Sequence, residues 1–342
     1  MLDYIFISGS HNIFGGGQVY IRDLNKKLNS LGYESCIIAS DTIFSNSIKI
    51  PRIDTWSLKF KNICKIIKLL RKIDPQKNAK IITNDITLSM LSIIIRISGW
   101  KVHPIIHMSL ANTSSTSIFI KYSYPLIRAL LINIGSSSIL SVNKENDKYF
   151  LRKSNYIGNF TSYTPDLIEN LKTLDFLYVG RFDIEKQPLE FIKILNNLKN
   201  NGLYFKSAMI GTGCLWNEAK KLISEFELND YIELTGFLNQ DEIIDYYKKS
   251  KLLFITSRTE GLPTVILDAA TFGTNFISPA LGSIKYINSK FGVGYVIPLS
   301  EMSSFILKNH KELIFNSQEI IDLSRHTHID RVVNNFIDLT LK

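Results

Sequence analysis

The chain has 342 residues, of which 40 are Lys or Arg and 31 are Asp or Glu, giving a formal net charge of +9. This length is sufficient for two domains of ordinary size, each with its own core. No stretch offers about 18 successive uncharged apolar residues, and the first residues lack the basic and apolar regions of a signal peptide. We therefore expect a cytoplasmic protein without a membrane span.

The basic residues are concentrated in the first half of the chain. Residues 1–170 contain 21 Lys or Arg and 11 Asp or Glu, whereas the remainder is close to neutral. This asymmetry indicates two domains with different partners. The basic half could face a nucleic acid, an anionic membrane surface or an acidic substrate.

The chain begins with the pattern of a βαβ unit. A strand, a glycine-rich loop, a helix and a second strand are expected at residues 4–7, 11–18, 19–31 and 35–39. Units of this kind imply a parallel sheet. Gly16 and Gly17 would let the backbone approach a ligand at the helix N-terminus, although a plain tight turn is the alternative. The loop does not fit the G-x-G-x-x-G dinucleotide fingerprint.

Residues 56–73 predict a helix with two unlike faces. One face is apolar and the opposite face carries lysines, Lys61, Lys65, Lys68 and Lys72, with no acidic residue in the helix. This pattern suits an ordinary domain helix with a solvated lysine face. It also suits a basic surface that lies against anionic lipid.

His107 is the candidate functional residue of the first half. Two further strands are expected at 80–83 and 102–106, with an apolar helix over 86–98 between them. His107 lies at the carboxyl end of the second of these strands. An open α/β sheet binds its ligands at the carboxyl ends of its strands. A lone histidine is usually structural, but the polar run 109–117 favours a site here. A helix over 118–134, a strand at 139–142 and a short helix from Lys144 complete the domain.

A second alternating series follows a turn-rich linker at residues 156–165. Strands are expected at 176–179, 205–210, 231–235 and 252–256, and helices at 188–200, 215–226, 240–249 and 263–272. We therefore predict domains at 1–160 and 161–328, and a C-terminal helix at 329–342 that could cross back to the first domain. Two parallel-sheet domains with ligand loops at their strand ends predict a cleft between them.

The helix at 263–272 predicts an anion site. Pro263 suits the first helical position, and Gly273 ends the helix. The free amides of Thr264 and Val265 would point beyond the carboxyl end of the preceding strand, where a phosphate could bind.

Charged side chains accompany this helix. Glu260 precedes it, and Asp268 lies one turn after Thr264 on the same face, so that both could bind hydroxyl groups. Arg181 and Lys186, at the end of the first strand of this domain, could neutralise a diphosphate, with two solvated cations as the alternative. The combination suggests a sugar nucleotide.

In these motifs the chain resembles the retaining glycosyltransferases of family 4, the glycosyl transferases group 1. Residues 179–186, V-G-R-F-D-I-E-K, are similar to the V-G-R-x-x-x-x-K segment of that family. Residues 260–268, E-G-L-P-T-V-I-L-D, are similar to its E-x7-E motif, with Asp268 in place of the second Glu, and residues 12–40 look like its first βαβ unit. The resemblance implies the GT-B fold, an α/β architecture of two Rossmann-like parallel-sheet domains facing each other across a cleft.

The resemblance also implies a set of site residues. The catalytic residues would be His107, Arg181, Lys186 and Glu260. The donor-binding residues would be Gly16, Gly17, Arg181, Lys186, Leu238, Glu260, Gly261, Leu262, Thr264, Val265 and Asp268. In this arrangement the two cations and the amides of the helix bind the donor diphosphate. Glu260 binds the donor sugar, Asp268 the ribose, and His107 lies beside the donor sugar.

The expected activity is transfer of a hexose-type sugar with retention from a nucleotide-diphosphate sugar, a UDP-sugar being favoured over a GDP-sugar. The acceptor would be a lipid-linked oligosaccharide of bacterial O-antigen, capsule or exopolysaccharide synthesis, reached from the cytoplasm at the inner face of the membrane. No D-x-D pair occurs, so we expect a metal-independent enzyme without a cofactor. Nucleic acid is not an expected partner, because no exposed aromatic residues interleave with the lysines.

Two alternatives remain open. One is a GT-B sugar-nucleotide epimerase, which would convert a sugar nucleotide without an acceptor. The other is a non-catalytic partner subunit that binds a nucleotide sugar.

Overall fold

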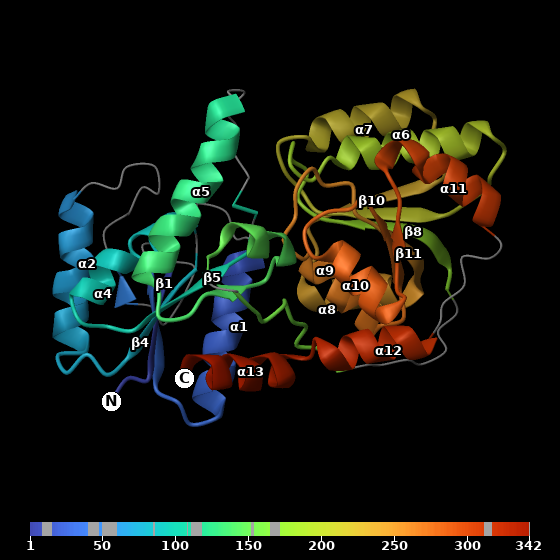
Figure 1. Ribbon diagram of the computed structural model, residues 1–342. Helices are drawn as coiled ribbons and strands as arrows, with labels where there is room; N and C mark the ends of the chain where they lie inside the picture. The colour runs from blue at the N-terminus through green and yellow to red at the C-terminus, as the bar shows by residue number, and fades with distance from the viewer. Residues whose placement is uncertain are drawn as a thin grey trace. The chain divides into compact units, whose positions relative to one another are not determined.

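The computed structural model (Figure 1) describes residues 1–8, 16–39, 48–49, 60–84, 86–107, 109–110, 118–151, 154–164, 172–310 and 317–341. The chain forms two compact units. Unit 1 comprises Met1–Ser162 and Ile329–Lys342, and unit 2 comprises Tyr163–His328. The first part of the expected glycine loop, residues 11–15, lies outside the described residues, as do Trp56, Pro165 and most of the polar run 109–117.

Unit 1 is built on a parallel sheet with the strand order β3-β2-β1-β4-β5-β6-β7. The strands are β1 (Tyr4–Ser8), β2 (Ser35–Ala39), β3 (Ile48–Lys49), β4 (Lys80–Thr83), β5 (Val102–Ile106), β6 (Leu140–Ser141) and β7 (Asn155–Tyr156). Every residue of β1 and β5 is buried, as expected for parallel strands covered on both faces. The order reverses between β1 and β4, and ligands of open α/β sheets bind beyond the carboxyl ends of such strands.

The helices of unit 1 form two layers, one on each face of the sheet. They are α1 (Gly16–Ser30), α2 (Phe60–Ile73), α3 (Ile86–Met90), α4 (Ser92–Ile97), α5 (Ile118–Gly135), the 3-10 helix η1 (Lys144–Tyr149) and α13 (Ile329–Leu341). On one face α13 packs beside α1 and covers Tyr4 and Phe6 through Phe336. On the other face α2, α3 and α4 cover Ile5 and Ile7, and α5 packs against α3 and α4.

Three details of unit 1 differ from the sequence-based expectation. The first helix begins at Gly16 rather than after the glycines. The helix expected over 86–98 is two short helices that break at Leu91. Tyr156, expected in the linker, belongs to β7, whose pairing with β6 extends the sheet.

Unit 2 is built on a second parallel sheet, with the strand order β10-β9-β8-β11-β12-β13. Its strands are β8 (Leu174–Val179), β9 (Ser207–Ile210), β10 (Ile232–Gly236), β11 (Ser250–Phe254), β12 (Asn275–Ser278) and β13 (Tyr295–Val296). Its helices are α6 (Pro188–Asn200), α7 (Trp216–Glu225), α8 (Gln240–Lys249), α9 (Thr264–Thr271), α10 (Ile284–Phe291), η2 (Leu299–Glu301), α11 (Met302–Asn309) and α12 (Ser317–His326). Phe254 packs edge-on against Phe176 and Phe191 in the core. This arrangement places β8 and β11 side by side.

The expected position of Pro263 within α9 is wrong by one residue. Pro263 is the N-cap, with an extended backbone (φ −63°, ψ 126°), and α9 begins at Thr264. The Pro263 carbonyl accepts a hydrogen bond from the Ile266 amide at 3.2 Å, so Pro263 caps the first turn and is not itself the first helical residue. Gly273 ends the helix as expected, with a left-handed φ of 72°.

Among the helices of the described segments, none combines the length and the apolar character needed to cross a bilayer.

Candidate functional site

The candidate site of unit 2 lies where β8 and β11 end. Arg181 and Lys186 follow β8, and Ser257 and Glu260 follow β11. These two strands are adjacent and parallel, with Phe254 opposite Tyr178, so their carboxyl ends lie together. Motifs about 70 residues apart in the sequence therefore meet at one edge of the sheet.

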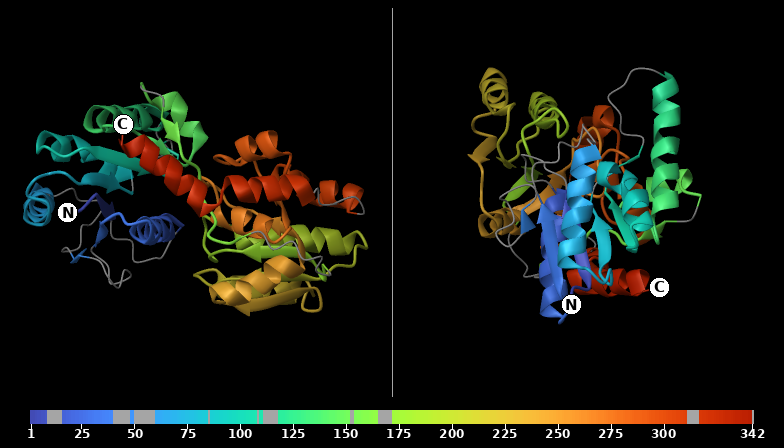
Figure 2. Two further views of the ribbon diagram at one scale, coloured as in Figure 1. Left: turned by 90° about the horizontal axis from the view of Figure 1, so that it is seen from below. Right: turned by 90° about the vertical axis from the view of Figure 1, so that its left-hand side faces the viewer.

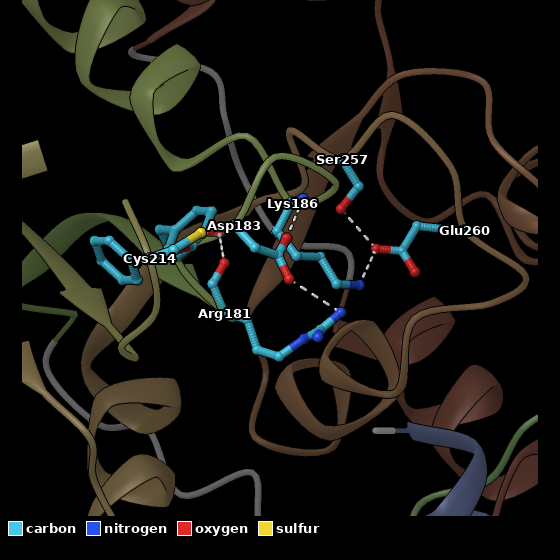
Figure 3. Close-up of polar contacts among 8 residues, drawn as sticks. Arg181, Asp183, Lys186, Cys214, Ser257 and Glu260 are labelled. Atoms are coloured by element: carbon cyan, nitrogen blue, oxygen red, sulfur yellow. Dashed lines mark hydrogen bonds and ion pairs between the residues drawn. The ribbon is translucent and has the colours of Figure 1, made fainter. Parts of the chain in front are cut away.

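Lys186 and Glu260 form an ion pair (Figure 3). The Lys186 Nζ atom lies 2.5 Å from Glu260 Oε1, and the Ser257 hydroxyl donates to the same oxygen at 2.6 Å. The Glu260 side chain is 11% exposed and that of Lys186 29%. Within the described residues, Oε2 of Glu260 has no hydrogen-bond partner. This oxygen is therefore free to accept from a ligand hydroxyl group.

Asp183 organises the loop that carries both cations. One of its oxygens pairs with Arg181 Nη2 at 3.1 Å, and the other accepts from the Lys186 amide at 2.9 Å (Figure 3). The Tyr178 hydroxyl donates to the Arg181 carbonyl at 3.0 Å. Burial, assisted by the charge of Asp183, raises the pKa of Tyr178, so this hydroxyl keeps its proton at neutral pH. The loop is thus held at both ends of the Arg181–Lys186 segment.

The cluster is electrostatically balanced. Arg181 and Lys186 each face a carboxylate, on Asp183 and Glu260. An anionic ligand must therefore draw the cations away from these partners, and it gains most if it also offers hydrogen-bond donors to the carboxylates. A diphosphate that carries a sugar with free hydroxyl groups meets both conditions.

Two glycines bring neighbouring loops into contact with this cluster. A Cβ atom on Gly211, whose φ is +134°, would lie 1.9 Å from the Gly180 carbonyl oxygen. A Cβ atom on Gly282, whose φ is +48°, would lie 2.1 Å from the carbonyl oxygen of Gly261. Both positions require glycine, because the loops after β9 and β12 pack directly on the backbone of the segments that carry Arg181 and Glu260.

The first turn of α9 follows Glu260 closely. Thr264 and Val265 are its first two residues, and no carbonyl of the helix precedes them to accept from their amides. Leu262 is buried, whereas Gly261 is partly exposed. Asp268 is half-buried and lies near the buried Tyr247, whose pKa is raised mainly by burial and further by this carboxylate.

Leu238 lies in the loop after β10. It is half-buried, next to Asn239, which caps α8. Its neighbour Phe237 is 79% exposed, a large aromatic surface at the carboxyl end of the sheet.

Unit 1 brings together Gly17, Asn84 and His107 at the ends of β1, β4 and β5. Asn84 Nδ2 donates to the Gly17 carbonyl at 3.1 Å, which fixes the orientation of the amide. Its Oδ1 atom then faces His107 Nε2 at 2.9 Å and must accept from it. Burial lowers the pKa of His107 to about 4, so the ring is neutral at pH 7. We therefore assign the single proton to Nε2, which leaves Nδ1 as an acceptor.

Two of the glycines expected in a ligand-binding loop of unit 1 belong to a helix instead. Gly16 and Gly17 form the first turn of α1, where Gly16 is exposed and Gly17 packs near the His107 ring. The Tyr20 ring lies edge-on against His107, with 4.9 Å between the ring centroids. His107 is therefore held by α1 as well as by Asn84.

Sequence reasoning missed Asn84 and Ser257. Both are polar residues near the carboxyl end of a buried strand, β4 and β11, and this placement is the signal that could have identified them. The described residues contain no cluster of three or more His, Cys, Asp or Glu side chains suited to a metal ion.

Known proteins resemble this chain in part of its sequence and in its fold. Residues 160–311 match the family model of glycosyl transferases group 1. In these residues the chain is similar to this family of glycosyltransferases, as the sequence motifs predicted. The structure also resembles Anabaena HepE in complex with UDP, with a TM-score of 0.75 and 12% identity over 98% of this chain and 99% of that one. The prediction of a two-domain α/β fold of the GT-B type is thereby confirmed.

Two relatives are bacterial glycosyltransferases. The capsular polysaccharide biosynthesis glycosyltransferase CapH of Staphylococcus aureus is 25% identical, over 92% of this chain and 93% of its own length. The UDP-Gal:alpha-D-GlcNAc-diphosphoundecaprenol alpha-1,3-galactosyltransferase of Escherichia coli is 28% identical over 46% of each chain.

Proposed function

We propose that this chain transfers a sugar from a UDP-sugar to a lipid-linked oligosaccharide, with retention at the anomeric carbon, in the synthesis of a bacterial surface polysaccharide. The observation that carries the proposal is the Lys186–Glu260–Ser257 cluster beside the first turn of α9. The names of the relatives support it, since one belongs to capsular polysaccharide biosynthesis and another uses UDP-Gal and a diphosphoundecaprenol acceptor.

Unit 2 would bind the donor. Arg181 and Lys186 would neutralise the diphosphate, and the amides of Thr264 and Val265 would donate to it. Asp268 would accept from the ribose hydroxyls, with Leu238, Gly261 and Leu262 forming apolar and backbone parts of the same site. These assignments follow the family motifs, and the half-buried carboxylate of Asp268 is compatible with its role.

Glu260 would exchange its partners when the donor binds. In the structure its Oε1 atom is held by Lys186 and Ser257. As Lys186 turns to the phosphate, the hydroxyl groups of the donor sugar would donate to Glu260 in its place. The exchange would favour an intact nucleotide sugar over a free nucleotide, because a free nucleotide leaves the carboxylate without a compensating donor.

The transfer step breaks the bond between the anomeric carbon and the leaving phosphate oxygen and forms a bond to the acceptor oxygen. The acceptor hydroxyl loses its proton to the departing diphosphate, whose charge is stabilised by Arg181, Lys186 and the helix amides. We propose that His107, Gly16 and Gly17 contribute from unit 1. A neutral His107 with an unprotonated Nδ1 can accept a hydrogen bond from a sugar hydroxyl.

We propose that the reaction needs no metal ion. Two cations and a helix N-terminus supply the positive charge that a divalent metal provides elsewhere. The enzyme would work in the cytoplasm, peripheral on the inner face of the membrane where a lipid-linked acceptor is presented.

The donor can be identified by thermal unfolding in the presence of UDP-glucose, UDP-galactose, their N-acetyl derivatives and GDP-mannose. A ligand that binds the native state raises the midpoint. We expect a UDP-sugar to give the largest shift and to support transfer to a polyprenyl-diphosphate oligosaccharide. A protein stabilised by none of these donors would refute the proposal, and one that converts a UDP-sugar without any acceptor would be an epimerase.

A further inference from the structure

The solvent face of α5 is aliphatic. On its inner side Ala129 and Ile132 are buried against Ile106 and Ile139. Among residues 123–135, the exposed ones are Leu126, Ile127, Leu130 and Ile134, each between 48% and 56% exposed. Spacings of three and four residues place these four side chains along one stripe of the helix. A surface helix of a globular protein ordinarily carries polar side chains there.

The stripe continues onto α4. Ile97, at the end of that helix, is 80% exposed. Its neighbour Arg96 donates to the carbonyls of Ile134 and Ser136 at 3.1 and 2.8 Å, which ties the end of α4 to the end of α5. The apolar side chains are thus part of one firmly packed surface, with an exposed guanidinium at its border.

The α-helices of the layer that contains α5 carry basic but no acidic residues, whereas η1, which packs against α5, carries Glu145 and Asp147 beside Lys144 and Lys148. Figure 2, in its right-hand view, shows α2, α4 and α5 side by side on one face of unit 1. The four helices of this layer, α2 to α5, contain no Asp or Glu, and residues 86–144 as a whole contain none. On α2 the apolar side is buried, and Lys65, Lys68 and Lys72 are exposed. The opposite layer differs, because α1 and α13 carry acidic residues such as Asp23 and Asp330.

We propose that this face of unit 1, the α5 stripe with Ile97 and the lysines of α2, binds the surface of an anionic lipid bilayer. The aliphatic side chains would enter the boundary between headgroups and acyl chains, and the cations would lie over anionic headgroups. The inference rests on the proposed function in one respect, since a lipid-linked acceptor is what makes a membrane-bound state useful.

Charge complementarity favours an anionic bilayer over a second copy of the chain as the partner of this face. A second copy of the chain would bring the same helices, α2 to α5, which carry Lys and Arg but no acidic residue, against the first, and like charges would repel. A bilayer with anionic lipid attracts the same face. The α2 lysines alone would attract the protein to the bilayer without inserting side chains into it. The α5 stripe adds an apolar contribution to the binding free energy, which salt does not screen. Binding should therefore weaken in high salt without disappearing.

The test compares two leucines of equal exposure. Leu130 on α5 and Leu31 at the end of α1 are each 48% exposed and belong to the same unit. Wild type, Leu130→Glu and Leu31→Glu would be sedimented with vesicles of phosphatidylglycerol and phosphatidylethanolamine, and with vesicles of phosphatidylcholine alone. We expect wild type and Leu31→Glu to bind the anionic vesicles equally, and Leu130→Glu to bind about tenfold more weakly. Thermal unfolding checks that both variants are folded.

Equal binding by the two variants, or preference of wild type for neutral vesicles, would overturn the proposal. So would a wild-type dimer in analytical ultracentrifugation that Leu130→Glu dissociates, because the face would then be an interface between copies. Transfer to a short-chain, water-soluble acceptor separates this inference from the proposed function. We expect Leu130→Glu to retain that activity. If wild type lacks the activity but binds vesicles as described, the membrane surface stands and the proposed transfer reaction fails.

Discussion

The substitution Glu260→Gln separates nucleotide binding from sugar transfer. It keeps the shape of the side chain and an acceptor for Ser257, but removes the charge that holds Lys186 at 2.5 Å. A partly exposed ion pair contributes about 1 kcal/mol, so freeing Lys186 should raise the affinity for UDP about fivefold. Loss of a charged acceptor for the donor sugar removes about 1.5–3 kcal/mol, which lowers kcat/KM for the UDP-sugar about 10- to 150-fold.

The assay is titration calorimetry with UDP together with steady-state kinetics with the donor. Asp175→Asn is the matched control, since it breaks the Lys251–Asp175 ion pair of 2.7 Å. This pair lies near the amino ends of β8 and β11, whereas the candidate site lies at their carboxyl ends. We expect the control to change neither UDP affinity nor turnover. If Glu260→Gln instead weakens UDP binding tenfold while the protein stays folded, Lys186 is not released to the phosphate and the exchange of partners is wrong.

Three further predictions concern the supports of the site and its chemistry. Asn84→Asp should raise the pKa of His107 from about 4 towards neutrality, because the new carboxylate faces Nε2. The acid limb of the pH dependence of kcat should then move to higher pH, and an unshifted limb would contradict the role of Asn84. Gly211→Ala should weaken UDP binding and destabilise the fold by more than about 1 kcal/mol, whereas Gly202→Ala, with a φ of +79° and open space around it, should only destabilise. Transfer should continue in excess EDTA, and its loss with recovery on adding Mg²⁺ or Mn²⁺ would refute metal independence.

The depressed pKa of His107 also makes the stability of the fold depend on pH. A histidine that is held neutral by burial binds its proton more readily when the chain is unfolded. Its contribution is complete above its ordinary pKa of 6.5 and is lost as pH falls towards about 4. Urea unfolding at pH 7.5 and pH 5 should show this loss, and His107→Gln should reduce it.

Strong local patterns made most of unit 2 predictable. The helices α6 and α8 have the bounds expected from their apolar periodicity, 188–200 and 240–249. At α8 the start is encoded directly, because Asn239 and Glu242 form a capping box. Where a helix carries its own start signal, its sequence is sufficient to predict where it begins.

Elements that depend on neighbours could not be predicted in the same way. The strands β3, β7 and β13 have two residues each and exist only because an adjacent strand pairs with them. Likewise Pro263 fits either the N-cap or the first helical position, and only the turn closed by the Ile266 amide decides between them.

The candidate site was predictable as a set of motifs but not as a set of contacts. Lys186 and Glu260 were each expected in the donor site, yet their pairing depends on β8 lying beside β11. Asn84 is 67 residues from Gly17 and 23 from His107, and it joins them because β4 lies between β1 and β5 in the sheet. Sequence spacing carries no information about such contacts.

The anomeric configuration of the product shows whether the chain is a retaining glycosyltransferase. Purified protein, the UDP-sugar that stabilises it most and a polyprenyl-diphosphate oligosaccharide would be incubated together, and the product analysed by proton NMR. We predict acceptor-dependent release of UDP and a new glycosidic bond with the anomeric configuration of the donor. An inverted linkage, or consumption of the UDP-sugar without transfer to the acceptor, would contradict the account.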